Sequence, residues 1–195
     1  MEHHHAKKSN LSNFEEREKV LPSQKILKDF GIRQGMHLAD LGCGYGFFSI
    51  RAAEMVGTEG MIEAVDIDEE RLAELQRRAE ARGVRSRILT YKVTEERVPL
   101  PDASVEIALI ANVLHELNDP LSYLKEVGRI LQSKGQVWIV EWQKKETPMG
   151  PPLHERRSTQ EWIEILREAG FQEFWSHDLE PAHVLIKGNY LPKGQ

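Results

Sequence analysis

Short apolar runs alternate along the chain with stretches whose apolar residues recur every three or four positions. The runs predict buried strands and the longer periodic stretches predict helices. Expected helices are 22–30, 47–55, 69–82, 120–131 and 158–169, and expected strands are 37–41, 61–66, 87–93, 105–111, 136–142, 171–177 and 182–187. A polar, partly helical lead-in, 10–18, precedes the first of these helices.

This alternation predicts an α/β fold, a doubly wound and mostly parallel sheet with helices on both faces. The last two strands follow each other with no helix between them, so they predict an antiparallel hairpin. We expect residues 21–195 to form one domain and residues 1–20 to be a lead-in that is a candidate lid. Ligands of such sheets bind beyond the carboxyl ends of the strands.

A glycine-rich turn, Asp40-Leu41-Gly42-Cys43-Gly44-Tyr45-Gly46, follows the first expected strand. Glycines allow positive φ and let a ligand approach the backbone closely, although the turn could also be only a tight strand-to-helix connection. Asp66 ends the second strand, 24 positions after Gly42. An acid at this offset can accept hydrogen bonds from ribose hydroxyls, the alternative being a helix N-cap or a loop acid.

Asp40 separates two classes of cofactor. A dinucleotide would place its anionic pyrophosphate over the turn, where a carboxylate repels it, and the third glycine of the dinucleotide pattern falls on Phe47. S-adenosylmethionine carries an ammonium and a sulfonium instead, which a carboxylate attracts. The residues therefore favour S-adenosylmethionine, with an NAD-dependent oxidoreductase as the weaker alternative.

Several segments in their order resemble the motifs of the Rossmann-like (class I) S-adenosylmethionine-dependent methyltransferases. They are 39–46 for the first motif, 64–68 for the second strand, 98–106 with 114–117 around the fourth strand, and 128–135 for a later motif. The resemblance covers roughly residues 20–188 and is strongest to the branch with ubiquinone and menaquinone biosynthesis methyltransferases.

The resemblance implies a seven-stranded sheet of order 3-2-1-4-5-7-6 with the last strand antiparallel. It also implies that Asp40 and Asn112 lie at the methionine end of the cofactor, Asp66 at the ribose and Ile67 against one adenine face. The turn backbone that would hold the methionine part comprises Gly42, Cys43, Gly44 and Gly46. The family's adenine-binding acid is replaced here by Thr94, with Glu95 beside it, so these two are the candidates for that contact.

Methyl transfer from a sulfonium mainly requires that the acceptor be oriented and water excluded. A general base helps only where the acceptor must lose a proton, and His115, after the fourth strand, is the candidate catalytic residue. Its alternative is a histidine that only fixes a loop. His154, Arg156 and Arg157 could meet an acceptor oxyanion or could form a charged surface turn.

Composition limits the classes of partner and the cellular location that we expect. With 26 basic and 31 acidic residues the net charge is −5, which disfavours broad binding to nucleic acid. No run of 18 apolar residues predicts a membrane span, and no signal peptide is expected. The single cysteine, Cys43, argues against disulfides and thiolate metal sites and suggests a cytoplasmic protein. His3 to His5 are expected to be a solvated tail or a tag remnant, not a metal site.

We therefore expect a methyltransferase that acts on a small, partly apolar acceptor. The side chains that could line such a site are Phe14, Leu21, Trp142, Met149 and Leu153. The alternative from another class is a cofactor-binding regulator or pseudoenzyme that transfers no methyl group. The sequence does not specify the oligomeric state.

Overall fold

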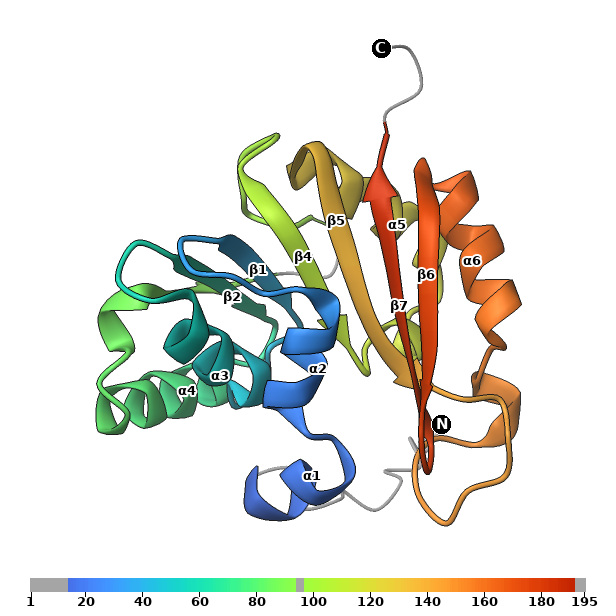
Figure 1. Ribbon diagram of the computed structural model, residues 1–195, viewed down its shortest axis with the longest axis horizontal. Helices are drawn as coiled ribbons and strands as arrows, with labels where there is room; N and C mark the ends of the chain where they lie inside the picture. The colour runs from blue at the N-terminus through green and yellow to red at the C-terminus, as the bar shows by residue number, and fades with distance from the viewer. Residues whose placement is uncertain (1–13, 94–96, 192–195) are drawn as a thin grey trace.

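A seven-stranded sheet forms the centre of the molecule. The structure, a computed structural model, describes residues 14–93 and 97–191 (Figure 1). The strands are β1 (His37–Leu41), β2 (Met61–Asp66), β3 (Ile88–Lys92), β4 (Val105–Ala111), β5 (Leu131–Trp142), β6 (Phe171–Leu179) and β7 (His183–Tyr190). Their order is β3-β2-β1-β4-β5-β7-β6, as the resemblance implied.

Strand direction also agrees with the expectation. Strands β3, β2, β1, β4 and β5 pair in parallel, whereas β7 pairs antiparallel with both β5 and β6. Leu41 is in register with Val65 on one side and with Ile110 on the other. The carboxyl ends of β1, β2 and β4 therefore meet at one edge of the sheet.

Helices cover both faces of the sheet (Figure 1). They are α1 (Phe14–Val20), α2 (Ser23–Phe30), α3 (Phe47–Val56), α4 (Glu69–Ala81), α5 (Pro120–Ile130) and α6 (Thr159–Glu168). Leu38 of β1 belongs to a core shared with α2, α3 and α4, whereas its neighbour Ala39 belongs to a second core shared with α5 and α6. Successive strand residues point to opposite faces, which is why one strand serves two cores.

Local signals placed the end of α2 and the start of α6 correctly, whereas Leu131, expected to belong to the helix from Pro120, is the first residue of β5. Gly31 ends α2 in the left-handed conformation, with φ of 97°. Ser158 and Glu161 form a reciprocal capping box at the start of α6. None of the described helices combines the length and apolar character that a membrane span needs.

Some strands are longer than the hydrophobic pattern predicted. Strand β5 begins at Leu131, because that residue pairs with Val105 across an irregularity in the β4–β5 ladder. Strand β7 continues to Tyr190 through polar positions that still pair with β5 and β6. Backbone pairing extends these strands beyond their apolar part.

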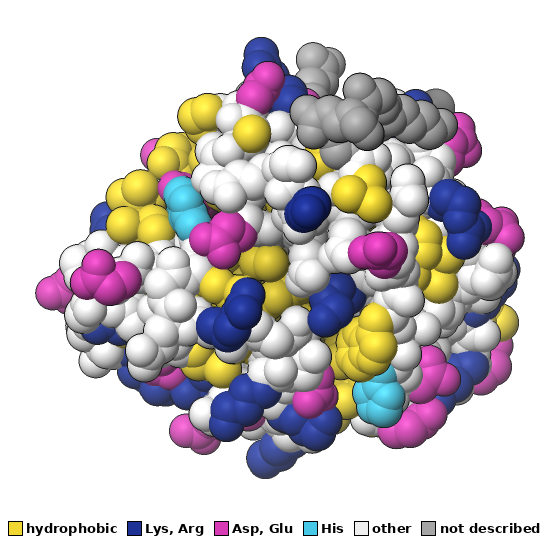
Figure 2. Space-filling model, turned by 45° about the horizontal axis from the view of Figure 1, so that its top comes forward, with side chains coloured by type: hydrophobic (Ala, Val, Ile, Leu, Met, Phe, Trp, Pro, Cys, Tyr) yellow, Lys and Arg dark blue, Asp and Glu magenta, His cyan; other side chains and the backbone are white. Residues whose placement is uncertain are grey.

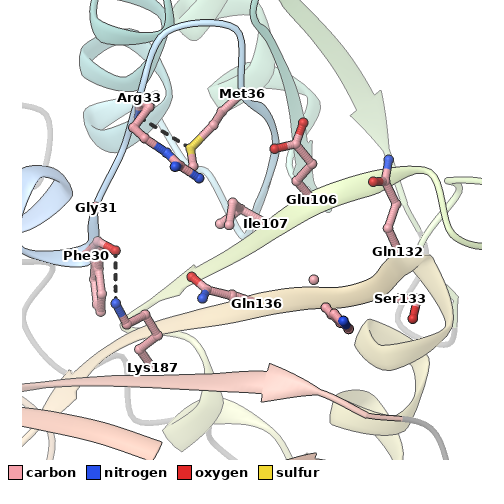
Figure 3. Close-up of a pocket in the computed structure, with 12 residues that line it drawn as sticks. Phe30, Gly31, Arg33, Met36, Glu106, Ile107, Gln132, Ser133, Gln136 and Lys187 are labelled. Carbon is pink, nitrogen blue, oxygen red and sulfur yellow. Dashed lines mark hydrogen bonds between the residues drawn. The ribbon is translucent and has the colours of Figure 1, made fainter. Parts of the chain in front are cut away.

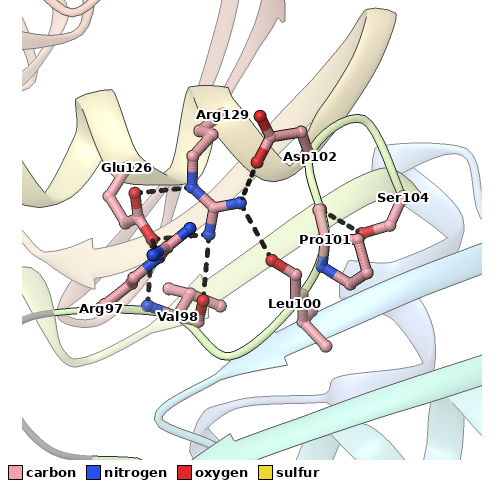
Figure 4. Close-up of polar contacts among 8 residues, drawn as sticks. All are labelled: Arg97, Val98, Leu100, Pro101, Asp102, Ser104, Glu126 and Arg129. Carbon is pink, nitrogen blue, oxygen red and sulfur yellow. Dashed lines mark hydrogen bonds and ion pairs between the residues drawn. The ribbon is translucent and has the colours of Figure 1, made fainter.

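Arg129 of α5 fastens the segment that leads into β4 (Figure 4). Its guanidinium donates to the carbonyls of Val98 and Leu100, at 3.0 Å each, and to the carboxylates of Glu126 and Asp102. These bonds hold an irregular stretch against the helix, so the resemblance seen in 98–106 reflects a structural support.

Candidate cofactor and acceptor site

Asp40 is a buried carboxylate at the carboxyl end of β1. Its side chain is only 2% exposed and accepts a hydrogen bond from Ser49 Oγ in the first turn of α3. Burial raises the pKa of Asp40 to about 6, although Ser49 and the charge of Arg17 oppose that rise. At neutral pH the group is still mostly ionised, so the site carries a negative charge suited to a cation.

The three glycines of the turn all have positive φ, but they differ in the space that a side chain would find. A Cβ on Gly42 would lie 2.4 Å from Cγ2 of Val113, and one on Gly46 would lie 2.6 Å from Cγ of Leu75. These two glycines are needed for packing. A Cβ on Gly44 would meet nothing within 4 Å, although its φ is 53°. Gly44 is therefore the glycine of this turn that leaves room for a ligand.

Cys43 lies inside the same turn. It is buried, and burial with the neighbouring charges of Asp40 and Asp66 raises the pKa of its thiol far above the ordinary value. A thiol in this state is not a nucleophile, because the thiolate is the reactive form.

Asp66 faces the turn from the end of β2. Its carboxylate accepts hydrogen bonds from the backbone N–H of Gly44, at 2.7 Å, and of Asp68, at 2.9 Å. The helix N-cap role, the alternative for Asp66, is taken by Asp68, whose side chain accepts from the first turn of α4. Each oxygen of Asp66 keeps a lone pair for a further donor. Ile67 beside it is 58% exposed.

Asn112 follows β4 next to the glycine turn. Its φ is 58°, its backbone N–H donates to the carbonyl of Val140 at 2.8 Å, and its buried Oδ1 has no hydrogen-bond partner among the described residues. The left-handed backbone aims this residue away from the strand direction. Of the expected cofactor contacts, Thr94 and Glu95 lie outside the residues that the structure describes.

His115 forms a buried pair with Glu141, at the end of β5. Its Nδ1 lies 2.9 Å from Oε2 of Glu141, and the side chains are 7% and 1% exposed. Burial lowers the pKa of His115, but the hydrogen bond and charge of Glu141, with smaller effects of Glu116 and Glu155, outweigh it and raise that pKa above its ordinary value. Glu141 also accepts from the backbone N–H of Trp142 at 3.1 Å.

The three basic residues around the proline loop differ in exposure and in contacts. Arg156 is buried and supports the loop: its guanidinium donates to the carbonyls of Pro151, Gln143, Lys145 and Met149 and to the hydroxyl of Thr147. The guanidinium of Arg157 lies over the ring of Trp162, and the His154 side chain is 81% exposed. Arg156 is thus neither of the two expected alternatives, because loop carbonyls use its donors.

Four residues near this edge were missed in the sequence. They are Arg17, Tyr123, Glu141 and His183. An acid at the end of a strand was a usable signal for Glu141, but nothing in the sequence indicated the others. Burial, and the charges of Asp40 and Asp66, raise the pKa of Tyr123 well above its ordinary value, so its phenol stays protonated beside the turn.

A separate cavity of about 480 Å³ lies at the other edge of the sheet (Figure 3). Its walls include Arg33, Glu106, Gln136 and Lys187, which lie at or near the amino ends of the parallel strands. It contains none of the expected site residues, and its position conflicts with the rule that ligands of parallel sheets bind at the carboxyl edge.

Comparison with known proteins agrees with this geometry. Residues 39–139 match the family described as a methyltransferase domain. The demethylmenaquinone methyltransferase of Staphylococcus aureus is 28% identical over 141 residues, covering 72% of this chain and 56% of that protein. The ubiquinone/menaquinone biosynthesis C-methyltransferase UbiE of Shewanella oneidensis is 28% identical over 114 residues, covering 58% of this chain and 45% of that protein. The chain thus spans about half the length of these curated relatives.

A solved structure covers more of the chain. It is a SAM-dependent methyltransferase from Aquifex aeolicus, with a TM-score of 0.85 and 28% identity over 94% of this chain and 100% of that one. The matched family region runs from the start of the Asp40 turn into β5, and the structural likeness extends to the antiparallel strand. The chain belongs to the methyltransferase domain family, as a class I, S-adenosylmethionine-dependent member related to the UbiE proteins.

Proposed function

We propose that the chain transfers the methyl group of S-adenosylmethionine to a small-molecule acceptor. The observation that carries this proposal is the room at Gly44, in the turn that follows the buried carboxylate of Asp40 and whose backbone donates to the buried carboxylate of Asp66. A ligand with a cationic end and a sugar diol suits this arrangement, because one carboxylate attracts the cation and the other accepts from the hydroxyls.

The cofactor contacts follow from that placement. Asp40 and the turn 42–46 would hold the methionine part, with Asn112 offering its unpaired Oδ1 to the ammonium group. Asp66 would hold the ribose, and the exposed side chain of Ile67 would lie against adenine. We keep Thr94 and Glu95 as the proposed contacts of the adenine amino group.

The bound cofactor supplies an activated methyl group and its own leaving group. The task of the chain is then to orient the acceptor and to exclude water. We assign the acceptor side to His115. Glu141 accepts from its Nδ1, whereas Nε2 has only a longer contact of 3.8 Å with Oε1 of Glu116, so Nε2 is the nitrogen that could orient an acceptor group or take its proton.

The acceptor is proposed to be small and partly apolar. The relatives described above are named for C-methylation in ubiquinone and menaquinone biosynthesis and for demethylmenaquinone, which supports a small molecule. Met149 and Leu153 are exposed apolar side chains of the loop after β5. Figure 2 shows the molecule from the side of the amino ends of the parallel strands, away from the candidate site, and basic and acidic side chains are interspersed there. The net charge of −5 does not favour a nucleic acid as the acceptor.

The lead-in is proposed as a lid over the methyl group. Helix α1 packs on α3 through an edge contact between Phe14 and Phe47, with ring centroids 5.3 Å apart. The guanidinium of Arg17 lies 4.4 Å from the centre of the Phe47 ring and interacts electrostatically with Asp40. The lead-in therefore reaches the cofactor end of the site. We also propose a cytoplasmic location, on the single cysteine.

Calorimetry with S-adenosylmethionine, S-adenosylhomocysteine and NAD tests this function. We expect micromolar binding of the first two and no comparable binding of NAD. The Asp40→Asn variant should weaken the binding of cationic S-adenosylmethionine more than the binding of S-adenosylhomocysteine, because S-adenosylhomocysteine lacks the sulfonium charge. Tighter binding of NAD would contradict the proposal. Mass spectrometry of a panel of candidate acceptors then separates an enzyme from a regulator, since a regulator binds the cofactor and methylates nothing.

A further inference from the structure

A buried histidine at the start of β7 lacks hydrogen-bond partners. His183 is 3% exposed, and neither Nδ1 nor Nε2 has a partner among the residues that the structure describes. Buried polar groups in native proteins are almost always paired, because an unpaired one loses its hydration without compensation. The imidazole thus has unused hydrogen-bonding capacity on both nitrogens.

The place of this side chain in the sheet connects it with the cofactor edge. His183 is in register with Trp142, and the two ring centroids lie 4.2 Å apart. Because β7 is antiparallel, its first residue lies at the carboxyl end of β5, on the edge where Asp40 and Asn112 also lie. Neighbouring strands are about 4.8 Å apart, so the start of β7 lies about 10 Å from the end of β4.

Among the residues that the structure describes, the groups that act electrostatically on His183 are all basic. Burial first, and then the charges of Arg17, Arg156 and His115, lower the pKa of His183 to about 4. The ring is consequently neutral at physiological pH, with one nitrogen as donor and the other as acceptor. A hydroxyl or an amide can satisfy either nitrogen, whereas a carboxylate can pair only with the N–H.

We propose that His183 recognises a neutral hydrogen-bonding group of the methyl acceptor, a hydroxyl or a carboxamide, on a part of the acceptor away from the atom that is methylated. Arg17 of α1 acts electrostatically on both Asp40 and His183, so the two groups face the same helix. His183 is then a specificity residue. The inference rests on the proposed function, because it needs an acceptor at this edge.

Phenol and toluene are suitable probes, since they have nearly the same shape and only phenol can form hydrogen bonds. Each is titrated into protein saturated with S-adenosylhomocysteine, and the ring nitrogens of His183 are followed by ¹H–¹⁵N NMR. Benzoate tests the anionic alternative. The variants are His183→Phe, which keeps a ring against Trp142, and His183→Gln, which keeps a donor and an acceptor. His177→Phe is the matched control, because His177 lies on β6 and stacks on Trp175 instead.

Phenol should shift the His183 nitrogen signals and toluene should not. His183→Phe should weaken phenol binding roughly three- to tenfold, the usual effect of one neutral hydrogen bond. Toluene and S-adenosylhomocysteine affinities should stay unchanged, His183→Gln should restore part of the phenol affinity, and His177→Phe should have no effect.

Three results would overturn the inference alone. They are an absence of phenol-dependent shifts at His183, equal phenol affinity in His183→Phe and the parent protein, and a His183-dependent preference for benzoate. In each of these cases S-adenosylhomocysteine still binds. Failure of S-adenosylhomocysteine to bind the parent protein would overturn the proposed function, and this inference with it.

Discussion

His115 and Glu141, 26 positions apart in the sequence, are joined by a hydrogen bond of 2.9 Å between Nδ1 and Oε2. The same carboxylate accepts from the backbone N–H of His115 at 3.4 Å. This double contact links the loop after β4 to the end of β5. The proton stays on Nδ1, which donates to Glu141, so in the neutral ring the lone pair is on Nε2.

The pH dependence of methyl transfer should reveal this pair. If His115 takes a proton from the acceptor, it must be neutral, so the rate should rise as pH increases through its raised pKa. Glu141→Gln removes the charge that raises this pKa, so the rising limb should move to lower pH. A pH profile that is unchanged in Glu141→Gln would show that His115 is not the titrating group.

The size of the effect at His115 separates its two roles. His115→Ala should lower the rate less than about tenfold if the side chain only orients the acceptor, and on the order of 100-fold or more if it is a general base. The measurement is kcat at saturating cofactor and acceptor. His154→Ala is the control, since that side chain is 81% exposed and should leave kcat unchanged.

The stability of the fold should also depend on pH through the titration of His115. Its pKa is higher in the folded than in the unfolded protein, so the pair stabilises the fold fully below the unfolded pKa of about 6.5 and loses this contribution as pH rises through the folded value. Urea unfolding at several pH values, compared with Glu141→Gln, measures the contribution. Identical pH dependence of the two proteins would contradict it.

Gly44→Val should abolish cofactor binding and leave the domain folded. The new side chain enters the open space at the turn, where we place the cofactor. The matched control is Gly83→Val, because Gly83 also has a positive φ, 67°, and nothing within 4 Å of a Cβ. Both variants should lose comparable stability from backbone strain, and only Gly44→Val should lose binding in calorimetry. Normal affinity in Gly44→Val would contradict the role of this glycine.

Asp66→Ala should weaken S-adenosylhomocysteine binding by roughly 1.5–3 kcal/mol, the range for a hydrogen bond to a charged group. Asp68→Ala is a useful comparison, since it removes the N-cap of α4 and should cost stability of about 1 kcal/mol without loss of affinity. A loss of binding free energy below about 0.5 kcal/mol in Asp66→Ala would show that this carboxylate only holds the backbone of the turn.

Deleting residues 1–20 tests the lid. The deletion removes α1 and keeps Leu21, which is buried in the core. We expect turnover to fall far more than the free energy of unfolding, because water would then reach the methyl group. Unchanged methyl transfer to the identified acceptor would show that the lead-in does not cover the reaction.

The local sequence determined the secondary-structure elements and the residues that meet at the glycine turn. The spacing of apolar residues placed every strand, and the capping residues Gly31 and Ser158 marked helix ends that the structure confirms. These signals act within a few residues, so the linear sequence contains them. The closeness of Asp40, the glycine turn and Asp66 was also predictable, because parallel strands bring their carboxyl ends together at one edge of the sheet.

The tertiary structure alone decided which side chains surround His115 and Trp142. Glu141 and His183 are neighbours of His115 and Trp142 only because β4, β5 and β7 lie side by side, and their partners are 26 and 41 positions away in the sequence. The sequence left two alternatives for Arg156, contact with an acceptor oxyanion and a place in a charged surface turn. The five hydrogen bonds to the loop show that it supports the loop instead. Hydrogen bonds and burial between distant segments depend on the packed chain, and therefore they leave no periodic pattern in the sequence.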